Sequence, residues 1–166
     1  MGEADRTEDR RLALLVDDDM VSRRHARRLL ELSGMDVVQA SNGLAALELI
    51  QRLPRRFRLV LIELDLQGIS GSVLTETLRL FRPELATLCM SSRTAAGLVD
   101  GRRCLAKPLH GPALQAAVEN GLASERPTFP EVWLARARAR YAVAGDLIEA
   151  ALELARAAGA DGEVSP

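Results

Sequence analysis

The chain has 166 residues, which is enough for one domain with a well-filled core and a small appendage. Its 22 basic and 23 acidic residues leave a net charge of -1, which argues against bulk electrostatic binding to nucleic acid or to an anionic membrane. Residues 1–11 are mostly charged and the long apolar stretches are only strand-length, so we expect a flexible N-terminus, no signal peptide, no membrane span and a cytoplasmic location.

Strand and helix patterns alternate along residues 12–123. The apolar run Leu12–Val16 predicts a first strand, and a helical pattern follows from Met20 to Leu32. The apolar run Leu59–Ile62 is typical of a parallel strand buried on both faces. The other predicted elements are strands at Asp36–Ala40, Leu85–Met90 and Cys104–Ala106, and helices from Gly43 to Leu53, from Gly71 to about Phe81 and from Pro112 to Leu122. Five alternations predict an α/β fold with a doubly wound, five-stranded parallel sheet.

Polar side chains follow the predicted strands at the edge where open α/β sheets place their sites. Asp17 and Asp18 end the first strand, Glu63 and Asp65 follow Ile62, and Ser91 and Lys107 end two later strands. Lys107 is the only lysine of the chain, which indicates a position that needs a compact ammonium. Solvation of the strand ends is the competing interpretation, but it accounts poorly for so many convergent groups.

The segments after residue 123 predict a separate appendage. Residues 124–130 (SERPTFP) are a proline-punctuated linker, and residues 131–158 form two short amphipathic helices joined at Gly145. We expect a helical hairpin there and a disordered tail at residues 159–166. The apolar sides of the hairpin would take part in a homodimer contact, and they include Trp133, Tyr141, Leu147 and Leu154.

Cys89 and Cys104 lie in apolar stretches and have no CxxC spacing. This pattern favours two buried free thiols over a disulfide.

Residues 12–123 resemble the receiver domain of two-component response regulators, a flavodoxin-like fold with strand order 2-1-3-4-5. The matching stretches are LLVDDD at 14–19, SNGLAALELI at 41–50, LVLIELDLQGISG at 59–71, CMSS at 89–92 and LAKPL at 105–109. The resemblance implies phosphorylation of a strand-end aspartate by a histidine kinase.

The resemblance also implies roles for single residues. Asp17 and Asp18 match the acidic pair that holds Mg²⁺, Ser91 matches the hydroxyl that contacts the phosphoryl group, and Lys107 matches the lysine that pairs with it. A carboxylate that attacks a phosphoryl dianion needs such cations to offset the charge. Mg²⁺ is therefore the one cofactor that the resemblance allows.

The chain departs from the family pattern at the phosphorylation site and its readout. Glu63 stands at the phosphoacceptor position, and Gln67 replaces the usual proline. The extra methylene of Glu63 lets its carboxylate reach about 1.3–1.5 Å further. Cys104 replaces the aromatic switch residue that the family couples to the hydroxyl of Ser91, and Thr94–Asp100 leaves room for barely two turns of the fourth helix.

These departures lead us to expect an atypical pseudo-receiver, not an enzyme, that acts through protein–protein contacts without phosphorylation. The alternative is a phosphorylatable receiver that uses Asp65 or Glu63 with Mg²⁺. A lesser alternative is a DNA-binding regulator acting through the C-terminal helices, but their acidic residues argue against it. The expected partner is a histidine kinase or another signalling protein.

Overall fold

The computed structural model describes residues 11–53, 57–82, 84–99 and 102–123. All of them lie in the first of two units into which the chain divides, residues 1–126. The predictions for the linker, for the hairpin at 131–158 with Trp133, Tyr141, Leu147 and Leu154, and for the tail lie outside the described residues, as does the terminus before Arg11.

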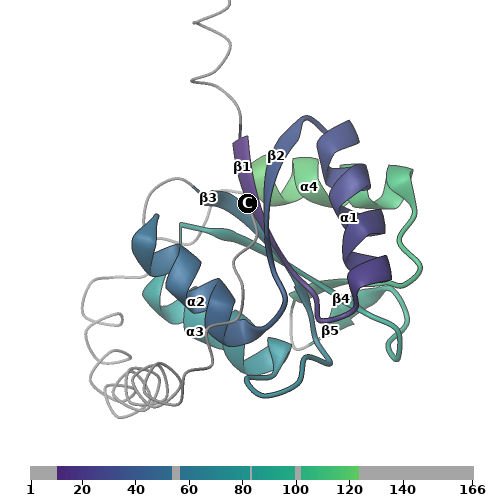
Figure 1. Cartoon of the computed structure of the whole chain (residues 1–166). Coiled ribbons are helices and arrows are strands. Elements are labelled where there is room, and N and C mark those ends of the chain that lie inside the picture. Colours follow the sequence, from purple (N-terminus) through teal and green to yellow (C-terminus); the bar gives the residue numbers. More distant parts are fainter. Residues whose placement is uncertain (1–10, 54–56, 83, 100–101, 124–166) are drawn as a thin grey trace, which may run out of the picture. The chain divides into compact units, whose positions relative to one another are not determined.

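The centre of the described unit is a sheet with helices on both sides (Figure 1). The sheet has six strands in the order β2-β1-β3-β4-β6-β5. Its first five members are parallel, which confirms the predicted 2-1-3-4-5 sheet. These strands are β1 (Arg11–Val16), β2 (Met35–Ala40), β3 (Phe57–Glu63), β4 (Ala86–Ser91) and β6 (Arg102–Ala106).

The sixth strand, β5 (Gly97–Val99), pairs antiparallel with β6 at the edge of the sheet. The segment Thr94–Asp100, where we expected a reduced or irregular fourth helix, thus holds a short strand in its described residues. Gly97 has φ +157°, which no α-helix accommodates, and the extended residues after it reach the backbone of β6. Hydrogen bonds to a neighbouring strand outweigh the weak helical preference of so short a segment.

Two helices cover each face of the sheet (Figure 1). Helices α1 (Met20–Leu32) and α4 (Gly111–Ala123) lie on one face, and α2 (Gly43–Arg52) and α3 (Gly71–Phe81) lie on the other. Successive side chains of β3 point to opposite faces, and all four residues from Leu59 to Ile62 are fully buried. The predicted double-sided burial of this strand is confirmed.

Side-chain caps start three of the helices. Asp19, Asn42 and Ser70 each accept a hydrogen bond from the backbone N–H three residues further on, at 2.6, 2.8 and 3.3 Å. These caps fix the direction in which the chain leaves the carboxyl ends of β1 and β2 and the loop after β3. No helix in the described part of the chain has the length and apolar composition that a bilayer crossing requires.

Candidate functional site

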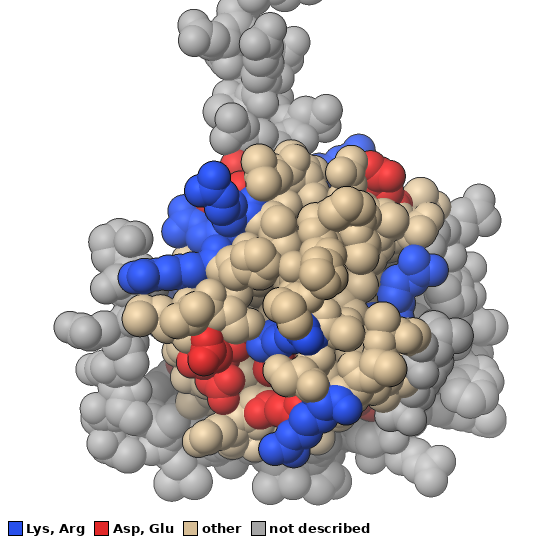
Figure 2. Space-filling view, turned by 90° about the vertical axis from the view of Figure 1, so that its right-hand side faces the viewer, with Lys and Arg blue, Asp and Glu red and all other residues tan. Residues whose placement is uncertain are grey.

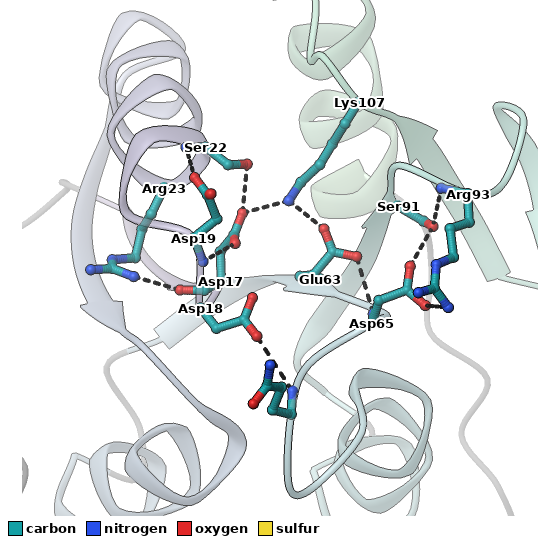
Figure 3. Close-up of polar contacts among 11 residues, drawn as sticks. Asp17, Asp18, Asp19, Ser22, Arg23, Glu63, Asp65, Ser91, Arg93 and Lys107 are labelled. Carbon is teal, nitrogen blue, oxygen red and sulfur yellow. Dashed lines mark hydrogen bonds and ion pairs between the residues drawn. The ribbon is translucent and has the colours of Figure 1, made fainter.

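Three charged side chains meet at the carboxyl edge of the sheet (Figure 3). Asp17 follows β1, Glu63 ends β3 and Lys107 follows β6, so the topology brings together residues far apart in sequence. The Lys107 ammonium donates a hydrogen bond to Asp17 Oδ2 at 2.7 Å and forms an ion pair with Glu63 Oε2. The lysine side chain is 12% exposed, and both carboxylates are buried. The ammonium therefore bridges two buried carboxylates.

The remaining carboxylate oxygens of this cluster also have partners. Asp17 Oδ1 accepts from the backbone N–H of Asp19 at 2.9 Å, and Asp17 Oδ2 also accepts from the Ser22 hydroxyl at 2.7 Å. Glu63 Oε1 accepts from the backbone N–H of Asp65 at 3.1 Å. Three of the four oxygens thus accept hydrogen bonds within the chain, and the fourth, Glu63 Oε2, is buried and has the ion pair with Lys107 as its contact.

The surroundings of Lys107 affect its pKa in two opposing ways. Burial alone would lower the pKa of Lys107, but the hydrogen bonds to Asp17 and Glu63 and their negative charges raise it above its ordinary value of 10.5. The lysine is therefore charged at neutral pH. The peptide bond between Lys107 and Pro108 is cis.

A second group of contacts surrounds Ser91 at the end of β4 (Figure 3). The buried Ser91 hydroxyl donates to Asp65 Oδ2 at 3.1 Å and accepts from the backbone N–H of Arg93 at 3.0 Å. The Arg93 guanidinium lies 3.6 Å from Asp65 Oδ1, but its side chain is 82% exposed, so this ion pair contributes little to stability. Ser91 and Lys107 thus bind different carboxylates.

Asp18 lies apart from the Lys107 cluster. Its exposed carboxylate points to the loop after β3, where Asp18 Oδ2 accepts a long hydrogen bond of 3.4 Å from the backbone N–H of Gln67 (Figure 3). The sequence grouped Asp17 and Asp18 as one acidic pair, whereas the structure gives them different partners.

A divalent cation needs several oxygen ligands that converge on one point. Within the residues that the structure describes, no three His, Cys, Asp or Glu side chains converge in a way that could hold a metal ion. The oxygens of Asp17 and Glu63 face internal donors, and Asp18 faces Gln67. As arranged, the residues at this edge do not fit Mg²⁺, which prefers a near-octahedral set of oxygens.

Gly71 fixes the backbone of Glu63. A Cβ atom at this position would lie 1.9 Å from the carbonyl oxygen of Glu63 and 2.7 Å from Cα of Leu64. Only a residue without a side chain therefore lets the start of α3 pack against the end of β3.

Cys104 lies behind the site, on β6, paired in register with Cys89 on β4. Neither cysteine forms a disulfide and both are buried, as predicted. Burial is the main cause that raises the pKa of Cys104, and the charges of Glu63 and Asp65 act in the same direction. The thiol is therefore protonated and inert at neutral pH.

Sequence reasoning missed three residues of the site. Asp19 and Ser22 support Asp17, and Arg93 binds the Ser91 hydroxyl through its backbone. The spacing of Asp19 and Ser22, typical of a helix N-cap, was a usable signal. Arg93 gave none, because its contact depends on how the loop after β4 folds.

The family model for the response regulator receiver domain matches residues 13–119 of the chain. The transcriptional activator protein ExaE of Pseudomonas putida is 40% identical over 89 residues, which are 52% of this chain and 40% of that protein. A transcriptional regulatory protein CpxR homolog of Haemophilus influenzae is 34% identical over 114 residues, which are 64% of this chain and 48% of that protein. The chain thus spans less than half the length of either relative.

Solved structures have the same fold. A CheY-like receiver domain protein from Methanospirillum hungatei JF-1 matches with a TM-score of 0.60 and 21% identity over 69% of this chain and 94% of that one. A chain of the CheX-CheY-BeF3-Mg+2 complex from Borrelia burgdorferi matches with a TM-score of 0.63 and 15% identity over 69% of this chain and 90% of that one.

Proposed function

Because the chain belongs to the response regulator receiver family, whose domains interact with histidine kinases and other signalling proteins, we propose that it is a pseudo-receiver that signals without being phosphorylated. It acts by presenting a fixed surface to a protein partner. Receiver domains are signalling domains and generally not enzymes, which agrees with this role.

The proposal depends on the contacts of Lys107 and Ser91, which match the two residues that hold a phosphoryl group in the family. The Lys107 ammonium is bound to Asp17 and Glu63, and the Ser91 hydroxyl is bound to Asp65. Both groups thus already contact carboxylates of the chain itself. A phosphoryl dianion entering here would have to displace these buried contacts and would face nearby negative charge.

Glu63 is central to this interpretation. It ends β3, and with Gly68 and Gly71 aligned to the family turn it stands at the phosphoacceptor position. The resemblance implies an aspartate there, whose shorter side chain would leave more room beside Lys107. We propose that Glu63 supplies a permanent negative group in place of a transient phosphoryl group.

The second candidate is a working receiver that is phosphorylated on Asp65 or Glu63 with Mg²⁺. Asp65 favours it, because its carboxylate is 37% exposed and lies next to the Ser91 hydroxyl. Asp65 is therefore more accessible to a phosphodonor than the buried Glu63.

Incubation with acetyl phosphate and Mg²⁺, followed by intact-mass spectrometry, separates the two candidates. We expect no mass gain for the natural chain. A Glu63→Asp variant restores the shorter carboxylate and is the matched positive control. A gain of one phosphoryl group on the natural chain, lost in Asp65→Ala or in Glu63→Ala, would contradict the proposal.

The natural partner and assembly extend the proposal. The relatives are named as transcriptional regulators, but the chain spans less than half of each. On the face shown in Figure 2, basic side chains are dispersed around a mainly uncharged surface, which gives no support to DNA binding by that face. We propose a homodimer through residues 131–158, and a monomer by light scattering at micromolar concentration would contradict it.

A further inference from the structure

We propose that the Lys107 ammonium is the resident cation of the acidic pocket and takes the place of a divalent metal, so that the domain keeps its active-site geometry without Mg²⁺. The inference deepens the proposed function and rests on it, since it takes Glu63 as the residue at the phosphoacceptor position. It adds that two departures from the family pattern, Glu63 and Gln67, act together to close the metal site.

The first step is the partial neutralisation of the two buried carboxylates by one ammonium, which offsets one of their two negative charges. Lys107 donates to Asp17 at 2.7 Å and pairs with Glu63, and its side chain is 12% exposed. The ammonium is tethered to the chain, so it is present at high effective concentration. A Mg²⁺ ion would have to lose tightly held water and expel this ammonium before it could bind both carboxylates.

The second step is the reach of Glu63. Its additional methylene carries the carboxylate about 1.3–1.5 Å beyond that of an aspartate. With this reach, Glu63 Oε2 pairs with Lys107 while Glu63 Oε1 accepts from the backbone N–H of Asp65. Neither oxygen is left to face a metal.

The third step concerns Asp18 and Gln67. Asp18 Oδ2 accepts a hydrogen bond from the backbone N–H of Gln67, and this bond directs the carboxylate to the loop after β3 (Figure 3). The resemblance implies proline at position 67, and proline has no N–H to donate. The glutamine therefore supplies a donor that draws the third acidic ligand away from the pocket.

The experiment measures Mg²⁺ binding by calorimetry, and Mn²⁺ binding by electron paramagnetic resonance, on the full-length chain after treatment with EDTA. The natural chain should show no saturable binding up to about 10 mM, beyond the roughly millimolar affinity of weak protein cation sites. Glu63→Asp with Gln67→Pro restores both family residues and should bind with a dissociation constant of about 1 mM or below, at least tenfold tighter than the limit of about 10 mM expected for the natural chain. Each single variant should give a smaller gain.

Lys107→Met removes the internal cation and should also gain metal binding. Arg24→Met removes an exposed charge of the same sign from α1, outside the pocket, and should leave binding unchanged. If Lys107→Met does not fold, as circular dichroism would show, the Glu63→Asp and Gln67→Pro variants still decide the question.

Two results would overturn the inference. One is saturable Mg²⁺ binding by the natural chain. The other is a folded Glu63→Asp/Gln67→Pro variant that binds no metal, because Glu63 and Gln67 would then not be the groups that close the metal site. Mg²⁺ binding by the natural chain without any mass gain from acetyl phosphate would overturn this inference and leave the proposed pseudo-receiver function standing.

Discussion

Replacing Lys107 by methionine should strongly destabilise the receiver domain. Methionine keeps a similar length but removes the ammonium, so Asp17 and Glu63 would remain buried at 0% and 4% exposure without a cation. Removal of one partner from a buried ion pair costs about 3–5 kcal/mol. This is a large share of the roughly 5–15 kcal/mol that stabilises a typical domain.

Urea denaturation followed by far-ultraviolet circular dichroism at pH 7 measures this loss. Thermal unfolding, followed by the same signal, gives a second measurement. Since a loss of 1 kcal/mol lowers the unfolding midpoint by about 4 °C, the midpoint should fall by roughly 12–20 °C. Adding Glu63→Gln to the Lys107→Met variant should recover part of the stability, because one uncompensated charge is removed. If the free energy of unfolding fell by less than about 1 kcal/mol, the reasoning would be refuted, because an exposed ion pair contributes no more than that.

The remaining predictions concern pH, caps, packing and thiols. The pKa of Lys107 is higher in the folded chain than its unfolded value near 10.5. The stabilising effect of Lys107 should therefore be complete below about pH 10.5 and should fall as the pH rises through the folded pKa. Denaturation of the natural chain and of Lys107→Met between about pH 9 and 12 checks this. Asp19→Ala removes the cap of α1 and should cost about 0.5–2 kcal/mol in urea denaturation, whereas no loss would contradict the capping role. Gly71→Ala should cost about 2–3 kcal/mol or more by the same assay, because its Cβ meets the carbonyl of Glu63; a neutral effect would show that α3 shifts freely. Cys104 should not react with Ellman's reagent at pH 8 until urea unfolds the chain, and fast labelling of the native protein would contradict its burial and raised pKa.

The sheet could be predicted because its signals are local and repeated. Leu59–Ile62 has the length and composition of a strand buried on both faces, and the helical pattern after Met20 fills the crossover between two parallel strands. The convergence of Asp17, Glu63 and Lys107 follows from topology, since parallel strands end at the same edge. Their functional roles stay predictions.

The orientation of Asp18, the strand β5 and the contact of Arg93 could not be predicted, because they depend on contacts that the order of residues in the sequence does not contain. Asp18 turns away from Asp17 because a backbone N–H at Gln67, 49 residues later, lies within reach. Strand β5 has only three residues, too few for a periodic pattern, and its extended form depends on hydrogen bonds to β6. Arg93 donates to the Ser91 hydroxyl from its main chain, so its residue type carried no information on that contact.

Strand β5 also bears on how the domain resists aggregation. Without it, β6 would present its five residues as the open edge of a parallel sheet, a template for strands of other chains. Antiparallel pairing of Gly97–Val99 with Arg102–Cys104 covers that edge and leaves a new one only three residues long. So short an edge offers few hydrogen bonds to an incoming strand, and the exposed Arg103 places a charge beside it. The segment that replaces a helix thus protects the sheet from edge-to-edge growth.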